Sequence, residues 1–296
     1  MPSKDINTVT ASTILTNSDY IFISKEGINL QRIAYNDFVD QLYNSGIFLS
    51  NVSGNASGAH NSIFRGKDLG EEFTSAQSTE IAAGRFTDLF IGDYWTINGR
   101  QYRIAAFDPY YRCGDNASLG HHIAVISNGV LYNAQMHSTQ SGVYVSGNEN
   151  NTTTNAYVGS DMRINNLSQA TDAFEEDFGL SHILTYRDML PNSTGSYNGY
   201  SCQATGAAWC DCSVELMSET MVYGNAVWGI SGFETSCYNS QFPLFKLAPD
   251  MIHIRSNWWL RNTANATSFS LVSSTGSLTY EPSSYPRGVR PFALIA

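Results

Sequence analysis

WWLRNTANATSFSLVSSTGSLTYEPSSYPRGVRPFALIA, residues 258–296, is the stretch that decides the fold. Trp258 and Trp259 are adjacent, so in a strand their side chains point to opposite faces. We expect buried indoles here and treat an exposed platform for stacking sugar rings as the less favoured alternative. Arg261, Arg287 and Arg290 sit among apolar residues, where a guanidinium often satisfies backbone carbonyl groups, so we expect them to support the framework.

The rest of this stretch predicts short strands. Residues 269–273 and 278–280 flank the turn Thr275-Gly276, and residues 289–295 form a further apolar run. The residues between the tryptophans and the final run are mainly Asn, Ser, Thr and Tyr, which are typical of adaptable recognition surfaces.

The region before this stretch combines helices and hairpins. Good helix formers and a terminal glycine predict a helix at 75–84, and a second helix is expected at 166–178. Asn98-Gly99 between alternating runs predicts a hairpin within 89–104. A second hairpin is expected from 123–126 and 129–132 around Ser127-Asn128. Residues 147–155 read as an exposed polar loop.

The N-terminal residues predict a small separate unit. Strands at 20–24 and 28–33 flank a turn at 25–27, and residues 35–43 carry apolar side chains at helical spacing. Such a strand–strand–helix unit buries little surface alone and needs a partner. We expect it to span 1–45, followed by a Gly/Ser/Asn-rich flexible linker at 46–65 and an α+β domain at 66–296.

Composition narrows the class of protein. Of 296 residues, 42% are hydrophobic and 12% aromatic, so the chain is globular. The net charge of −10 without a basic stripe disfavours nucleic acid and anionic membrane as partners. Five irregularly spaced cysteines make a poor disulfide framework, so we expect reduced thiols. We find no signal peptide and no apolar run long enough to span a membrane, and expect synthesis in a cytoplasm.

The sequence offers little catalytic chemistry. His121 and His122 are adjacent and face opposite ways in a strand; with His137 and Asp115 they could form a metal site, but we favour ordinary polar and core histidines. Glu175–Asp177 reads as the exposed arc of a helix. No nucleophile elbow, zinc-protease motif or phosphate loop occurs. We therefore expect no enzyme activity, no metal and no cofactor.

The closing motif resembles a known domain family. NWWLR at 257–261, followed by a polar stretch and GVRPF at 288–292, is similar to the end of C-type-lectin-like domains of phages and bacteria, which are related to phage tropism determinants and to formylglycine-generating enzymes. Four upstream segments add support: IGDYWTING at 91–99, IAAFD at 104–108, YVGSDMR at 157–163 and VELMSE at 214–219. Residues 1–45 resemble the attachment segments of phage fibres, which are commonly trimers.

The resemblance implies a C-type-lectin-like fold with short antiparallel strands and at least two helices, and a binding site between the two conserved ends. The ligand-binding positions it implies are Asn262, Asn265, Thr267, Ser268, Ser270, Ser273, Thr279, Tyr280, Ser284 and Tyr285.

Two departures from the relatives limit what the resemblance implies. No cysteine follows Cys237, which argues against the oxidase activity of the formylglycine-generating relatives. Glu281-Pro282-Ser283 is a fragment of the calcium-lectin motif and follows the tryptophans instead of preceding them, which argues against calcium-dependent sugar binding.

These features together predict a phage virion appendage, a head, tail or baseplate fibre, assembled in the host cytoplasm and located in the virion. Its expected partners are a host cell-surface glycan or protein and other virion structural proteins, and its expected state is a homotrimer. The alternatives are a structural capsid or tail decoration protein without a specific receptor and, with least support, an enzyme acting on host polymers.

Overall fold

The computed structural model describes residues 20–23, 31–34, 56–137, 155–194, 204–228, 240–265 and 267–296. Contacts between Cα atoms divide the chain into two units, Met1–Ser53 and Gly54–Ala296. In the first unit, β1 (Tyr20–Ile23) pairs antiparallel with β2 (Gln31–Ala34), which confirms the two predicted N-terminal strands. The turn predicted at 25–27 and the helix predicted at 35–43 lie outside the described residues.

The second unit begins earlier than the composition predicts. Helix α3 (Ala56–His60) ends in a buried histidine whose ring lies against Phe86, Phe90 and Phe107, with centroids 5.2–5.7 Å apart. The amide of Asn61 donates to the Phe107 carbonyl at 2.9 Å. The prediction of a flexible linker through residue 65 is therefore wrong for residues 56–65. Small polar residues dominate this segment, but His60 and Asn61 anchor it to the domain.

The second unit is of mixed α+β type and mostly β, as the sequence predicts. One five-stranded sheet has the order β3-β4-β5-β14-β9, and all of its neighbouring strands are antiparallel. Its strands are β3 (Tyr94–Ile97), β4 (Arg100–Phe107), β5 (Ile123–Ser127), β14 (Pro291–Ile295) and β9 (Val214–Leu216).

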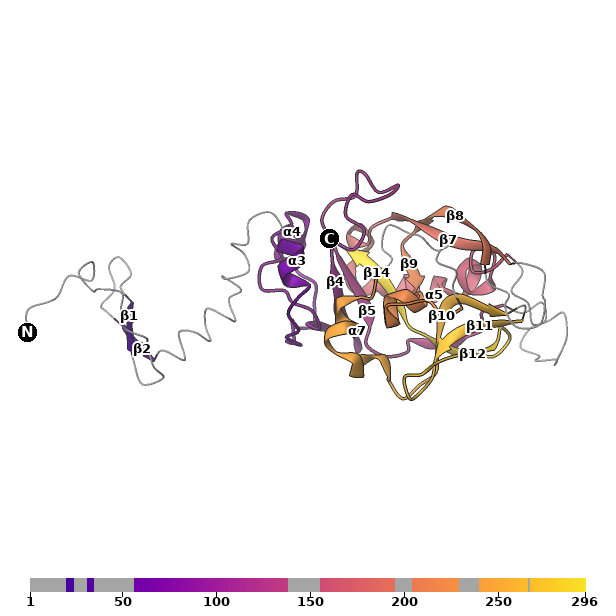
Figure 1. Ribbon diagram of the computed structural model, residues 1–296. Coiled ribbons are helices and arrows are strands. Elements are labelled where there is room, and N and C mark those ends of the chain that lie inside the picture. Colours follow the sequence, from indigo (N-terminus) through magenta and orange to yellow (C-terminus); the bar gives the residue numbers. More distant parts are fainter. Residues whose placement is uncertain are drawn as a thin grey trace, which may run out of the picture. The chain divides into compact units, whose positions relative to one another are not determined.

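The second five-stranded sheet has the order β12-β11-β10-β13-β6. It contains one parallel pair, β10 with β13. Its strands are β12 (Leu278–Pro282), β11 (Ser268–Val272), β10 (Trp258–Asn265), β13 (Arg287–Val289) and β6 (Tyr132–Ala134). A separate two-stranded ribbon is formed by β7 (Tyr186–Thr194) and β8 (Ala204–Cys212). Figure 1 shows β10, β11 and β12 side by side.

Short helices connect the strands. Helix α4 (Ser75–Ala82) begins with a capping box between Thr74 and Gln77, and α5 (Ser168–Phe178) follows one turn of π-helix at Met162–Asn166. These two α-helices confirm the helices predicted at 75–84 and 166–178. The remaining helical segments are 3-10 turns at Leu180–His182 and Pro249–Ile252, α6 (Glu219–Tyr223) and α7 (Pro243–Leu247).

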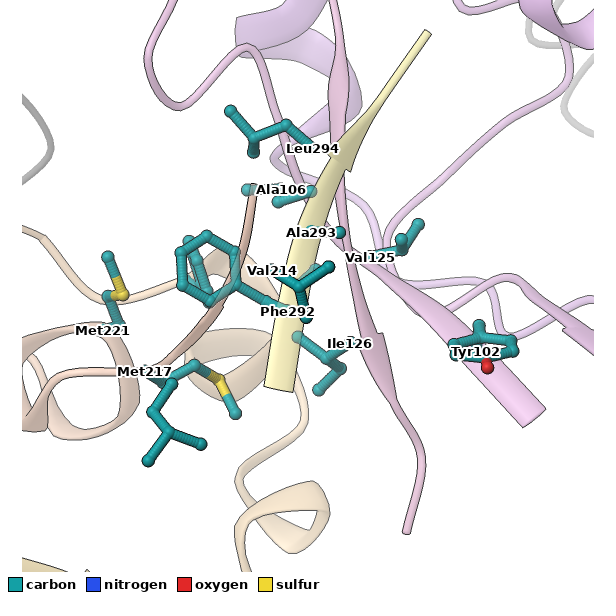
Figure 2. Close-up of a cluster of buried hydrophobic side chains, with 14 of the residues drawn as sticks. Tyr102, Ala106, Val125, Ile126, Val214, Met217, Met221, Phe292, Ala293 and Leu294 are labelled. Atoms are coloured by element: carbon teal, nitrogen blue, oxygen red, sulfur yellow. The ribbon is translucent and has the colours of Figure 1, made fainter. Parts of the chain in front are cut away.

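Strand β14 lies at the centre of the hydrophobic core. All five of its residues are buried, because it pairs with β5 on one side and β9 on the other. Figure 2 shows Phe292 and Leu294 on one side of this strand, with Met217 and Met221 beyond Phe292, and Val125 on the other side. A strand buried on both faces reads as a continuous apolar run, which is how PFALI appears in the sequence.

The hairpin predicted within 89–104 is confirmed. Strands β3 and β4 pair from Tyr94 and Arg103 to Ile97 and Arg100. Asn98 and Gly99 have φ of 50° and 77°, the two positive values that a type I′ turn requires.

The second predicted hairpin is wrong. Strand β5 pairs with β4 and β14, whereas β6 pairs with β13 in the other sheet. Strands β4 and β14 therefore occupy both edges of β5, so β6 cannot pair with it. The chain at Ser127-Asn128 leaves this sheet and continues to β6 in the other one.

The final apolar run is also divided. Residues 289–295 are predicted as one strand, but β13 belongs to one sheet and β14 to the other, and the chain crosses between them at Arg290. The loop predicted at 147–155 lies outside the described residues, apart from Asn155. Strands β11 and β12 confirm the strands expected at 269–273 and 278–280.

Candidate functional site

The candidate site is the surface around Tyr280 on β12, the edge strand of the second sheet. The side chain of Tyr280 is 48% exposed, and its ring meets that of Trp228 edge to face, with centroids 5.4 Å apart and planes at 85°. Thr279 and Tyr285 are also partly exposed, but Thr279 adjoins Tyr280 in the strand, so its side chain points to the opposite face of the sheet. We call Tyr280 and Trp228 the Tyr280 surface. Trp228 was not predicted, because its contact with Tyr280 leaves no local pattern in the sequence.

Three other predicted positions are partly exposed and engaged within turns. The Asn265 Oδ1 atom accepts hydrogen bonds from the backbone and hydroxyl of Thr267, at 2.9 and 3.0 Å. The Ser273 hydroxyl lies 3.0 Å from that of Thr275 and accepts from the Ser277 backbone at 3.0 Å. These side chains fix the two turns of the β10–β11–β12 meander, and Asn265 and Thr267 border the end of β12 because the Ser283 N–H donates to the Thr267 carbonyl.

Four predicted binding residues are buried, and the expectation that they lie on the surface is wrong. They are Asn262, Ser268, Ser270 and Ser284, each with at most 4% of its surface exposed. Asn262 accepts a hydrogen bond from the Glu219 backbone at 2.8 Å and so fixes the start of α6. Ser270 pairs with Tyr280 in the sheet, yet its hydroxyl is covered and has no hydrogen-bond partner in the described part of the chain. Small polar side chains fit into the interior, so polarity alone does not place them outside.

The predicted framework residues are buried with one exception. Arg287 is partly exposed and pairs with Glu281, whereas Trp258, Trp259, Arg261 and Arg290 are buried. Both Trp258 and Trp259 are fully buried, which confirms the expectation of buried indoles; their Nε1 atoms donate to the carbonyls of Ile252 (3.3 Å) and Ala134 (2.9 Å). Arg290 is also fully buried.

The Arg290 guanidinium joins three parts of the fold. It donates to the carbonyls of Ser127 at 3.0 Å and Met251 at 2.9 Å, and its centre lies 4.9 Å from a Trp258 ring centroid. The predicted structural role of Arg290 is therefore confirmed. Burial, together with the Arg103 charge, lowers the pKa of Arg290 to about 9.

A buried ion pair joins β10 to β7. The Arg261 guanidinium donates to the Asp188 carboxylate at 2.8 Å, and the Tyr110 hydroxyl donates to the same oxygen at 3.0 Å. Burial and the Asp188 charge raise the pKa of Tyr110 well above its ordinary value. Nearby, Arg163 pairs with buried Glu215 at 3.0 Å, and burial raises the pKa of Glu215 despite that partner. Arg261, Asp188, Tyr110 and Glu215 are buried and support the fold, whereas Arg163 is partly exposed.

The histidines are held apart in separate contacts. His121 Nδ1 lies 2.8 Å from Asp108, and His137 Nδ1 lies 3.2 Å from Asp161. His122 is buried, which lowers its pKa. Asp115 pairs instead with Arg187 at 3.4 Å. Within the described ranges, no group of three or more His, Cys, Asp or Glu side chains is arranged to hold a metal ion.

The cysteines and helices add two observations. Cys113, Cys210 and Cys212 are free thiols, and burial raises the pKa of Cys210 and Cys212. Cys202 and Cys237 lie outside the described residues. No helix in the described part of the chain is long and apolar enough to span a bilayer.

In comparisons with known proteins, no family model, no curated protein and no solved structure matches this chain. The resemblance to C-type-lectin-like phage proteins therefore stays a prediction based on the motifs quoted above.

Proposed function

We propose that this protein is a phage virion appendage, a head, tail or baseplate fibre, and that the Tyr280 surface binds a glycan or protein on the host cell. We further propose that the second unit has a C-type-lectin-like fold. The observation that supports binding best is the exposed Tyr280 ring, held edge to face against Trp228 on an edge strand.

The chemistry of this surface suits recognition. Tyrosine and tryptophan provide a large contact area, lose little side-chain entropy on binding, and offer a polar atom for hydrogen bonding. The framework below is rigid, because Trp258, Trp259 and Arg290 are fully buried and each donates hydrogen bonds to backbone carbonyls. Contact residues on a rigid support bind at a lower entropic cost than the same residues on a flexible one.

The first unit has a complementary role in this proposal. An isolated two-stranded antiparallel pair such as β1–β2 is at best marginally stable in water. We propose that residues 1–45 attach the protein to other virion structural proteins and associate into a homotrimer, which would supply the missing partner surfaces.

A cell-binding experiment tests the receptor role. The fluorescently labelled full chain is incubated with a panel of bacterial strains, and bound fluorescence is measured by flow cytometry. We expect binding to a subset of strains, and we expect Tyr280→Ala to weaken it at least tenfold, which corresponds to about 1.4 kcal/mol. Leu180→Ala is the control, since Leu180 is a large exposed apolar side chain on a separate 3-10 turn. Equal binding by the wild type and Tyr280→Ala would contradict the site assignment.

Location in the particle separates a receptor-binding fibre from a decoration protein. An antibody raised against the folded second unit, Gly54–Ala296, and visualised on assembled virions by electron microscopy, should label an appendage tip. Uniform labelling of the capsid shell, together with failure to bind any strain, would favour the decoration protein.

A further inference from the structure

A cleft beside α5 lies away from the Tyr280 surface. Its walls are α5 and the connection between β5 and β6, and the β3–β4 turn closes one end. Its volume is about 560 Å³, within the range of small-ligand sites. Its lining includes Arg100, Val130, Leu131, Tyr132, Gln169 and Asp172.

The walls of this cleft are held rigidly. The Asp177 carboxylate on the inner side of α5 accepts from Arg100 at 2.6 and 2.7 Å, from Asn98 at 2.8 Å and from the Tyr102 hydroxyl at 2.6 Å. These bonds tie α5 to the β3–β4 hairpin. On the other wall, the Tyr132 hydroxyl donates to the Asn166 carbonyl at 2.5 Å. The cleft is therefore formed before any ligand arrives, which lowers the entropic cost of binding.

The polar groups suit hydroxyl groups of a ligand. Gln169 and Asp172, one helical turn apart on α5, are both exposed. An amide and a carboxylate supply donors and acceptors for neighbouring hydroxyls.

The apolar and charged groups narrow the ligand class. Val130 and Leu131 are half-buried and offer an apolar patch for the C–H face of a ring. The lining cation is Arg100, and its guanidinium is occupied by Asp177 and Glu176. An acidic ligand would therefore meet the Asp172 carboxylate without a cation free to pair with it.

We propose that this cleft is a second ligand site and that it binds a neutral saccharide. It is distinct from the Tyr280 surface, because Tyr132 belongs to β6 and Tyr280 to β12, and these strands form opposite edges of one sheet. The inference does not depend on the proposed receptor role.

Binding of free sugars to the full chain tests it. The probes are N-acetylglucosamine, glucose and glucuronic acid, titrated to tens of millimolar and followed by saturation-transfer NMR. We expect at least one neutral sugar to bind saturably and glucuronic acid to bind at least tenfold more weakly. Loss of a hydrogen bond to a charged group corresponds to a roughly ten- to hundredfold effect, so Asp172→Ala should weaken binding by about that factor.

Three further variants locate the bound sugar. Glu175→Ala is the matched control: it removes a carboxylate from the same helix that does not line the cleft, and binding should persist. Ala173→Trp should block the cleft, with thermal unfolding measured to verify its fold. Tyr280→Ala should leave sugar binding unchanged. The proposal is overturned if no neutral sugar saturates the protein, if Asp172→Ala and Glu175→Ala bind alike, or if Tyr280→Ala removes the signal.

Discussion

At the scale of single residues, the buried carboxylate of Asp188 is paired with a buried guanidinium. Arg261 and Asp188 lie 2.8 Å apart with 2% and 0% of their side chains exposed. The Tyr110 hydroxyl and the Met189 backbone N–H also donate to this carboxylate. An ion pair of this kind contributes little net stability when complete, but losing one partner leaves an uncompensated charge in the interior.

The first prediction concerns that pair. Arg261→Met should lower the free energy of unfolding by about 3–5 kcal/mol, because it leaves the Asp188 carboxylate buried without its cation. Arg187→Met is the control, because Arg187 pairs with Asp211 at the surface, where solvent screens the two charges, and its loss should cost far less than the loss of Arg261. Denaturant unfolding of both variants measures the difference. Similar losses in the two would show that the buried charge is compensated in another way.

The second prediction concerns an exposed pair after α4. Hydrogen bonds from Arg85 and Thr87 lower the pKa of Glu80 from 4.5 to about 2. Because the folded-state pKa lies below the unfolded one, this stabilisation is present above pH 4.5 and is lost as the pH falls through about 2. Solvent screens this exposed pair, so its contribution to the free energy of unfolding should be small.

NMR titration of the Glu80 carboxyl group checks this directly. The pKa of Glu80 should rise towards its ordinary value in Arg85→Gln and stay low in Arg65→Gln, since Arg65 binds Asp88 and Asp93 instead. An ordinary pKa for Glu80 in the wild type would contradict the prediction.

At the scale of elements, the close approach of strands depends on one glycine. Gly288 in β13 pairs with Trp258 in β10, and a Cβ atom at this position would lie 2.4 Å from Val130 Cγ2 and 2.8 Å from the Asn257 carbonyl oxygen. Side-chain movement relieves the first contact, but the second is with backbone.

The third prediction follows from this contact. Gly288→Ala should destabilise the second unit by about 1–3 kcal/mol, the usual cost of overpacking a close-packed interior. Gly120→Ala is the control, because a Cβ there meets nothing within 4 Å. Thermal unfolding of the two variants tests the prediction, and a wild-type midpoint for Gly288→Ala would contradict it.

Elements with local signals are the ones that the sequence predicts well. Asn98-Gly99 specifies its turn because both residues tolerate positive φ, and α5 follows from helical spacing. The pairing of β5 with β14 has no local signal, because these strands are far apart in the chain. For this reason the local sequence predicts a hairpin at 123–132, whereas in the structure this segment connects the two sheets.

At the scale of the whole molecule, the chain consists of two units, and the second contains the described core. The fourth prediction is that deletion of Met1–Ser53 leaves this unit folded, with a midpoint of thermal unfolding within about 2 °C of the full-length value, a shift that corresponds to less than about 1 kcal/mol. The proposed attachment role adds a second readout: light scattering should give a trimer for the full chain and a monomer for residues 54–296. A large fall in the midpoint would contradict the independent folding of the second unit. An unchanged oligomeric state would contradict the proposed role of the first unit in trimer formation.

One residue of the candidate site could be predicted from the local sequence, and its partner could not. Tyr280 could be chosen from the sequence because it lies in a polar stretch between two framework motifs. Its partner Trp228 could not, because their contact requires α6 and the residues after it to be placed against β12. The cleft beside α5 likewise needs three segments to meet, and none of them carries a binding motif.

The sequence by itself determined the α+β class, the Asn98-Gly99 hairpin, the two main helices and the burial of Trp258, because backbone preferences and side-chain periodicity act between near neighbours. Only the tertiary structure decided which polar residues face solvent. Ser268 and Ser270 resemble Tyr280 in polarity and position, yet they are buried, on the strand that lies between β10 and β12, whereas Tyr280 on the edge strand is exposed. Burial depends on distant parts of the chain, and no local pattern records them.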